Sequence, residues 1–207
     1  MAEQEEKQPV LRLASASPRR RQLLDLIGVP HVVTPADIDE TPHAAEEPSL
    51  YVCRLAMDKA RAVRDRHQDL PVLAADTTVC IDGQILEKPT DEADCVRMLN
   101  LLSGRRHEVF TGVCIVGDLF PSLGPVRTEV HFRQISPVEM RAYWASGEPQ
   151  GKAGAYAIQG LGAVFVEKIV GSYTNVMGLP LFETASSLRN HGIAVWNGKL
   201  PKFDEGN

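Results

Sequence analysis

Short apolar runs of strand length alternate with amphipathic stretches of helical spacing from one end of the chain to the other. This alternation predicts an α/β fold. Strands are expected near 10–14, 31–34, 70–76, 107–117, 126–135 and 163–171, and helices near 17–28, 49–67, 90–104, 136–147 and 180–191. The fourth and fifth strands are joined by a turn-rich segment and should pair antiparallel, so we expect a mixed central sheet flanked by helices.

Capping side chains mark where three of these helices begin. Ser17 precedes a proline, which suits the first helical position, and we expect it to cap the first helix. Thr90 or Asp91 is expected to cap the helix that ends near 104. Ser136 and Glu139 have the spacing of a capping box, in which each side chain bonds the backbone N–H of the other residue.

Composition is that of an ordinary globular protein. The chain has 207 residues, of which 43% are hydrophobic and 24% are charged, and it is long enough to bury a sizeable core. Since no repeat or long linker divides it, we expect a mobile amino-terminal tail over 1–9 and one domain over 10–207. The formal net charge of −5 offers no long-range attraction to nucleic acid or to an anionic membrane. Any bound anion must therefore be held by a local cluster of cations.

The cysteines and the amino terminus favour a cytoplasmic protein. The four cysteines are widely spaced without a zinc-like rhythm, and we interpret them as small buried apolar side chains. The acidic start lacks the apolar core of a signal peptide, and no stretch approaches the roughly 20 apolar residues that span a bilayer. The sequence also lacks the Walker A and dinucleotide-binding glycine patterns.

Three arginines, Arg19 to Arg21, lie in the first turn of the first expected helix. The amino end of a helix carries roughly half a positive charge, which disfavours further cations there. Exposed backbone N–H groups and guanidinium groups at a strand-to-helix turn suit a phosphate, so a bound oligophosphate would explain the cluster. The alternative is a solvated face in which the arginines pair with acids such as Asp25.

Two further candidates come from the long helix and from the apolar run that follows it. Lys59 falls within the apolar stripe of the helix at 49–67, where it can either snorkel to water or meet a phosphate in a cleft. Asp76 is expected to end the strand that begins near 70, with Thr77 adding a hydroxyl beside it. With Asp39 or Glu40 as a second acid, Asp76 could hold a divalent cation; the alternative is a turn residue and a solvated loop.

A lysine and a glutamine complete the candidates. Lys88 precedes a proline and, taken alone, is best interpreted as an ordinary surface lysine. Gln159 lies in the glycine-rich loop at 147–162, whose glycines allow the backbone to approach a ligand closely. Its amide can donate and accept at once, as needed to recognise the adjacent N–H and C=O of a uracil-type base, or it can simply satisfy loop backbone groups.

Seven stretches, in this order, resemble the Maf family of nucleotide pyrophosphatases. They are SASPRR, the KA of LAMDKA, AADTTV, KPTDEA, SGRRHEVFTG, GEPQGKAGAYAIQG and GSYTNVMGLPL. The resemblance implies a mixed-sheet α/β fold with two lobes around a central cleft, similar to ITPases. It also implies hydrolysis of a nucleoside triphosphate to the monophosphate and pyrophosphate. Glu87 and Met177 depart from the usual glycine and valine of the family, but neither change removes a functional side chain.

The resemblance implies a role for each candidate residue. The stretches ADT, SG-x-x-H and AGAY-x-IQG together resemble the motifs of the family branch that acts on dTTP and UTP. The positions that match phosphate contacts are Ser15, Arg19, Arg20, Lys59 and Lys88; Asp76 matches the catalytic acid, Glu40 a metal or water partner, and Thr77 and Gln159 the base-selecting positions. The implied cofactor is a divalent cation, Mg²⁺ with Mn²⁺ as the alternative, on Asp76 and Glu40. A homodimer is expected from the family alone.

These roles lead to the hypothesis that Asp76, alone or with Glu40, orients a metal-activated water toward the α-phosphorus while the basic cluster holds the departing pyrophosphate. Two rival functions fit the same pattern. One is a pyrophosphatase for other modified or non-standard triphosphates, and the other is a nucleotide-sensing regulator of cell division. A carboxylate among the cations favours turnover over binding alone, because an unneeded carboxylate would repel a polyanion.

Overall fold

The structure, a computed structural model, describes residues 8–119 and 122–196. Its strands are β1 (Leu11–Leu13), β2 (His31–Val33), β3 (Val72–Ile81), β4 (Gln84–Leu86), β5 (Arg106–Val116), β6 (Ser122–Phe132) and β7 (Val166–Val170). Its α-helices are α1 (Pro18–Leu26), α2 (Pro48–Arg64), α3 (Glu92–Leu102), α4 (Pro137–Ala145), α5 (Tyr173–Val176) and α6 (Leu181–Asn190), and two 3₁₀ turns are η1 (Ala153–Ala155) and η2 (Leu161–Phe165). Most of the tail expected over 1–9 lies outside the described residues, as does the end of the expected domain.

The strands form one mixed sheet in the order β2-β1-β3-β5-β6-β7, and β4 forms a hairpin with β3. β1 pairs parallel with β2 and with β3, whereas β3, β5, β6 and β7 pair antiparallel in turn. The expected mixed sheet and the antiparallel pairing of β5 with β6 are therefore confirmed. β6 begins at Ser122, earlier than expected, because its ladder with β5 continues as far as the pair Ile115 and Ser122.

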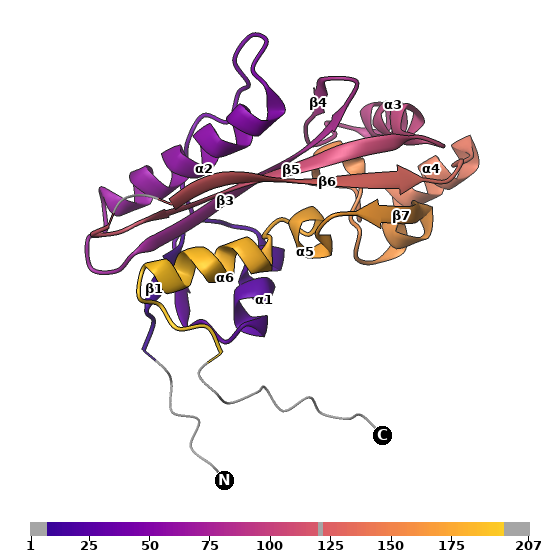
Figure 1. Ribbon diagram of the computed structural model, residues 1–207. Helices are drawn as coiled ribbons and strands as arrows, with labels where there is room; N and C mark the ends of the chain where they lie inside the picture. The colour runs from indigo at the N-terminus through magenta and orange to yellow at the C-terminus, as the bar shows by residue number, and fades with distance from the viewer. Residues whose placement is uncertain (1–7, 120–121, 197–207) are drawn as a thin grey trace, which may run out of the picture.

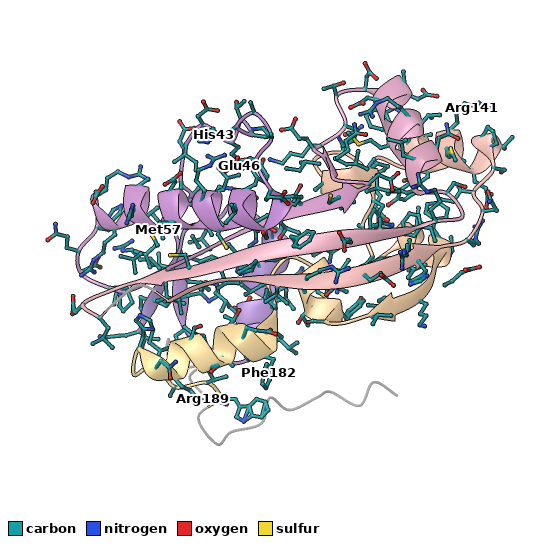
Figure 2. All side chains as sticks on the ribbon, turned by 45° about the horizontal axis from the view of Figure 1, so that its top comes forward. His43, Glu46, Met57, Arg141, Phe182 and Arg189 are labelled. Atoms are coloured by element: carbon teal, nitrogen blue, oxygen red, sulfur yellow. The ribbon has the colours of Figure 1, made fainter. Side chains whose placement is uncertain are left out.

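Helices cover both faces of the sheet (Figure 1). α2 packs over β3 and β5 on one face, and α1 and α6 lie on the opposite face. The close approach of α2 depends on Gly112 in β5, because a Cβ at this position would lie 2.3 Å from the carbonyl oxygen of Val52. In Figure 2, Met57 of α2 lies against the sheet, where its sulfur is 3.6 Å from that of Cys114, while Phe182 of α6 points away from it.

Two apolar clusters form the cores of the expected two lobes. One cluster joins α3 and α4 to the carboxyl ends of β3 and β6 and to the amino end of β5, and it includes Leu99, Phe132 and Met140. The other cluster joins α1 and α6 to β1, to the amino end of β3 and to the carboxyl end of β5, and it includes Leu13 and Leu24. The long strands β3 and β5 pass through both clusters, so they hold the two lobes together. In the part of the chain that is described, no helix is both long and apolar enough to cross a membrane.

The expectation that Asp76 ends a strand is wrong. Asp76 lies in the middle of β3, which continues to Ile81. The strand continues because β5 pairs with it along this whole stretch, from Val72 to Cys80. On its other edge β3 pairs with β1 only at 72–73 and with β4 only at 79–81. Among the described residues the segment 74–78 therefore has no strand partner on that edge, although Asp76 itself is only 7% exposed.

Local capping chemistry was mostly predictable. Asp91 caps α3 by accepting from the N–H of Asp94, and Ser136 with Glu139 forms the expected capping box of α4. Ser17 occupies the cap position of α1, but its side chain makes no capping hydrogen bond, so its expected capping interaction is wrong. The strand expected over 163–171 begins only at Val166, because η2 occupies the preceding residues.

Candidate active site

A pocket of about 970 Å³ lies beside the unpaired edge of β3, between the two lobes. Its walls come from the start of α1, the loop before α2, the face of α2, the middle of β3, the segment after β4 and the loop that contains η1. The structure brings all nine predicted site residues into this lining: Ser15, Arg19, Arg20, Glu40, Lys59, Asp76, Thr77, Lys88 and Gln159. Side chains that are scattered over most of the chain therefore face one space.

Alternation along β3 sends neighbouring side chains to opposite faces of the sheet. Asp76 points toward α2, where its Oδ1 accepts a hydrogen bond of 2.6 Å from Nζ of Lys59. Thr77 points toward α1, where its Oγ1 accepts a bond of 3.1 Å from Arg20. Both residues line the same pocket because the open edge of β3 connects the two faces at this point.

Lys59 holds two carboxylates together. Its Nζ lies 2.6 Å from Oδ1 of Asp76 and 2.6 Å from Oε1 of Glu40, and the residue is only 7% exposed. Lys88 contacts the other oxygen of Glu40 at 3.1 Å. Burial would raise the pKa of Glu40, but the hydrogen bonds and charges of Lys59 and Lys88 outweigh burial and hold that pKa below its usual value. Lys59 therefore belongs to the pocket and does not snorkel to bulk water.

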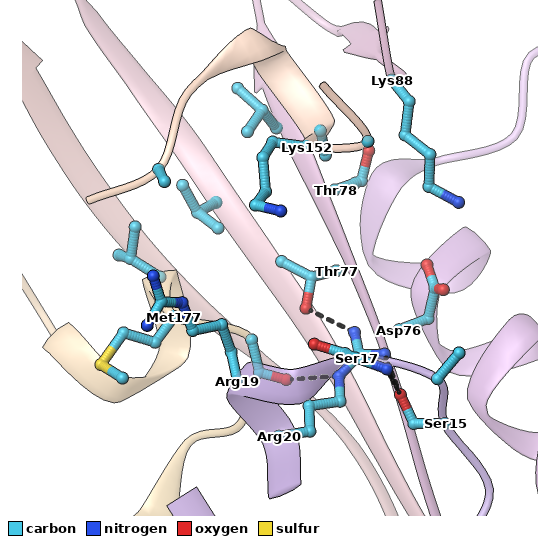
Figure 3. Close-up of a pocket in the computed structure, with 18 of the residues that line it drawn as sticks. Ser15, Ser17, Arg19, Arg20, Asp76, Thr77, Thr78, Lys88, Lys152 and Met177 are labelled. Atoms are coloured by element: carbon cyan, nitrogen blue, oxygen red, sulfur yellow. Dashed lines mark hydrogen bonds between the residues drawn. The ribbon is translucent and has the colours of Figure 1, made fainter. Parts of the chain in front are cut away.

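Arg20 is bound only by neutral groups among the described residues. Its guanidinium donates to the carbonyl of Gly178 at 2.8 Å, to Ser15 Oγ at 3.1 Å and to Thr77 Oγ1 at 3.1 Å. Burial lowers the pKa of Arg20, and the more distant charges of Asp76 and Glu40 act in the opposite direction. Figure 3 shows this guanidinium between the sheet and the start of α1. A polyanion in the pocket would supply its direct counter-charge.

The three neighbouring arginines have different surroundings. Arg19 lines the pocket and donates to Gln22 at 3.2 Å. Arg21 is exposed and lies 3.8 Å from Asp25, one turn further along α1. The phosphate interpretation therefore suits Arg19 and Arg20, whereas the solvated-face alternative describes Arg21.

The glycine-rich loop contributes a buried acceptor and an additional cation. Oε1 of Gln159 is buried in the pocket wall without a hydrogen-bond partner in the described chain. Lys152, which our sequence analysis did not select, also lines the pocket, and Figure 3 shows it pointing inward opposite Arg20. Its ammonium has no ion-pair or hydrogen-bond partner within residues 8–119 and 122–196. A lysine next to glycines in the same loop as Gln159 was the signal that could have identified it.

The lining has an excess of positive charge. Its five cationic residues are Arg19, Arg20, Lys59, Lys88 and Lys152, and its three acidic residues are Glu40, Asp76 and Glu87. The described residues contain no group of three or more His, Cys, Asp or Glu side chains that could hold a metal ion. Two carboxylates nevertheless converge on one cation, the ammonium of Lys59. Because Mg²⁺ commonly binds one or two carboxylates together with substrate phosphates, this donor set fits a divalent ion.

Sequence comparisons match this chain to one family of proteins over most of its length. The Maf-like protein family matches residues 10–191. A dTTP/UTP pyrophosphatase from Sphingopyxis alaskensis is 55% identical over 189 residues, which cover 90% of this chain and 99% of that protein. A dTTP/UTP pyrophosphatase from Myxococcus xanthus is 52% identical over 91% of this chain and 95% of its own. The Staphylococcus aureus Ham1 protein matches 59% of this chain and 71% of its own at 17% identity, with a TM-score of 0.45.

Proposed function

Because the chain belongs to the Maf-like protein family, we propose that it hydrolyses dTTP and UTP to the nucleoside monophosphate and pyrophosphate. The relatives with this activity share about half of its residues over nearly their whole length. The observation that carries the proposal is the convergence of the predicted residues on one pocket with a surplus of cations. Because the formal net charge of the whole protein is −5, this local surplus of positive charge does not follow from the overall composition. The pocket therefore suits a polyanionic substrate.

The triphosphate binds between α1 and the lysines of the opposite wall. It carries about four negative charges, which the cationic lining can balance together with a divalent ion. The first turn of α1 adds backbone N–H groups, since no capping bond from the Ser17 side chain occupies them. Arg19 and Arg20 hold phosphate oxygens from this side, and Lys88 holds them from the other.

Asp76 and Glu40 would hold the divalent ion, Mg²⁺ or alternatively Mn²⁺. When bound, the ion would neutralise phosphate charge and lower the pKa of a water molecule. Asp76 orients the attacking water toward the α-phosphorus and accepts its proton, with Glu40 as its partner. Lys59 keeps these carboxylates close together and carries the charge that stabilises the departing pyrophosphate.

Gln159 selects the base. Its buried Oε1 lacks a partner in the described protein, and the N3–H of uracil or thymine would satisfy it. Cytosine carries an acceptor at that position, so its nucleotide would leave two acceptors facing each other. Thr77 assists in base selection, because its hydroxyl is held in place by Arg20 and by the Thr111 hydroxyl, which lies 2.9 Å away. The homodimer and the cytoplasmic location stay predictions.

A panel of nucleoside triphosphates tests the function, with phosphate and pyrophosphate measured separately in the presence of Mg²⁺ or Mn²⁺. We expect dTTP and UTP to give equal amounts of monophosphate and pyrophosphate, and dCTP and dATP to react much more slowly. Release of inorganic phosphate would mean attack at the γ-phosphorus and would contradict the proposal. Preference for a non-standard triphosphate, or tight binding with no product under any divalent metal, would favour one of the rival functions.

A further inference from the structure

The loop that carries Gln159 is closed by one carboxylate. Glu148 lies just after α4, and its Oε1 accepts from the backbone N–H of Gly162 at 2.8 Å. Its Oε2 accepts from the N–H of Leu161, also at 2.8 Å. The side chain therefore ties the beginning of the loop to its end, across more than a dozen residues. Hydrogen bonds to a carboxylate are stronger than those between neutral groups, so this closure restrains the loop firmly.

Tyr143 extends the closure to the other side of Gln159. Its hydroxyl donates to Oε1 of Glu148 at 2.8 Å and accepts from the N–H of Ala157 at 3.0 Å. Ala157 precedes Gln159 by two residues, and Leu161 follows it by two. We call the two side chains of Tyr143 and Glu148 the clasp. The backbone on both sides of Gln159 is bonded to it.

Two glycines of the loop pack directly against the clasp. A Cβ added to Gly160 would lie 2.3 Å from Oε2 of Glu148, and one added to Gly162 would lie 2.6 Å from the hydroxyl of Tyr143. Gly160 also has a φ of +100°, which side chains rarely tolerate. The glycines on either side of Leu161 thus leave room for the clasp as well as for the turn.

Neither Glu148 nor Tyr143 lines the pocket. Tyr143 is buried in the core of the lobe that contains α3 and α4, where its ring packs edge-on against Phe165 at a centroid distance of 5.0 Å. Any effect of these two residues on a nucleotide must therefore pass through the loop. The loop supplies Gln159 to the base, whereas Asp76 and Arg20 stand on separate elements.

We propose that Glu148 is a positioning residue for base recognition: with Tyr143 it fixes the backbone around Gln159 so that the amide faces the nucleotide base. This inference rests on the proposed function, because it concerns the choice among nucleotides at the same site. It assigns selectivity to a carboxylate outside the pocket. The chemical step should depend on it much less than the choice of base does.

Glu148→Gln is the direct test. An amide offers one acceptor oxygen and places an NH₂ group against a backbone N–H, so at least one clasp bond is lost. Tyr143→Phe is the milder second variant, because it removes only the hydroxyl. Glu139→Gln is the matched control: Glu139 is also bound by backbone and side-chain donors, in the capping box of α4, but it does not contact the loop. Steady-state kinetics with dTTP, UTP and dCTP, and the melting temperature, are measured for each protein.

We expect Glu148→Gln to raise KM for dTTP about tenfold and to lower the preference for dTTP over dCTP by a similar factor, while kcat changes by less than about twofold. Tyr143→Phe should act in the same direction, and Glu139→Gln should leave KM and the preference unchanged. In a Gln159→Ala background, Glu148→Gln should cause no further loss of preference, because the clasp acts through Gln159.

Three results would overturn the inference. These are an unchanged preference in Glu148→Gln, an equal loss of kcat with every nucleotide, and a loss of preference in Glu139→Gln that matches the loss in Glu148→Gln. The wild-type protein separates this failure from failure of the proposed function. If wild type turns over neither dTTP nor UTP, the function is wrong; if wild type is selective and Glu148→Gln is equally selective, only the role of Glu148 is wrong.

Discussion

Asp76 is the proposed base and a proposed anionic metal ligand, and an amide could take neither role. It is 7% exposed, and its Oδ1 lies 2.6 Å from Nζ of Lys59. Asp76→Asn keeps the shape of the side chain and leaves Lys59 paired with Glu40, but it removes the proposed base and one proposed anionic ligand. We expect kcat to fall about a thousandfold or more, which is the scale of general-base catalysis combined with loss of a metal ligand.

The measurements for Asp76→Asn are pyrophosphate release and, by calorimetry, dTTP binding. Binding should persist, because Arg20 and Lys88 remain in place and one repelling charge is gone. Turnover near the wild-type rate would remove Asp76 from the mechanism.

Lys152 is the cation of the pocket whose role the sequence did not suggest. Its ammonium has no partner in the described part of the chain, so a bound phosphate would be its counter-charge. Lys152→Met preserves most of the side-chain volume and should raise KM for dTTP about tenfold, the loss expected for one charged hydrogen bond. Lys168→Met is the matched control, because Lys168 is exposed on β7 and does not line the pocket. Equal KM values in both variants would exclude Lys152 from substrate binding.

At the scale of the element, the loop that supplies Glu40 is fastened to α2. Arg54 donates to both carboxylate oxygens of Glu46 at 2.7 Å, and the hydroxyl of Tyr51 donates to the carbonyl of Glu40 at 2.9 Å. The hydrogen bonds from Arg54 lower the pKa of Glu46 from 4.5 to about 2. The pair therefore stabilises the fold fully above pH 4.5, and this contribution declines as the pH falls toward 2.

The lowered pKa of Glu46 determines how stability should depend on pH. The difference in free energy of unfolding between wild type and Glu46→Gln should be largest near neutral pH and should shrink as the pH is lowered through 4.5 toward 2. Chemical denaturation at a series of pH values measures it. Glu167→Gln, on an exposed face of β7, provides the comparison. A difference that does not vary with pH would contradict the role of the Glu46 charge.

Elements with local chemical signals were predictable, and those fixed by distant partners were not. The capping box at Ser136 and the Asp91 cap depend on residues three positions away, so the sequence contains their full cause. The central position of Asp76 depends on where β1 and β4 pair with β3, which no local pattern records. The clasp similarly depends on hydrogen bonds from Leu161 and Gly162 to Glu148, which lies more than a dozen positions earlier in the chain.

At the scale of the whole molecule, the pocket receives residues from both lobes. Arg19 and Arg20 come from the lobe that contains α1, whereas Lys152 and Gln159 come from the loop packed on the other core. Arg19, Arg20 and Gln159 could be predicted because the family resemblance marks each of them separately, whereas Lys152 was missed. The way in which the open edge of β3 connects the two faces could not, because it is a property of the assembled sheet.

A nucleotide that bridges the lobes should stabilise both of them. In the Asp76→Asn variant, which should bind dTTP without consuming it, dTTP at a hundred times its Kd adds about 2.7 kcal/mol to the free energy of unfolding. For a chain of this size that corresponds to a rise in Tm of about 5–10 °C. Hydrogen exchange should then slow both at the start of α1 and in the loop around η1. Pyrophosphate alone should protect the start of α1 and the backbone at Lys152, whereas thymidine alone should protect only the part of the loop around Gln159. Protection by dTTP that is confined to one lobe would mean that the pocket does not hold the base and the phosphates in the way proposed.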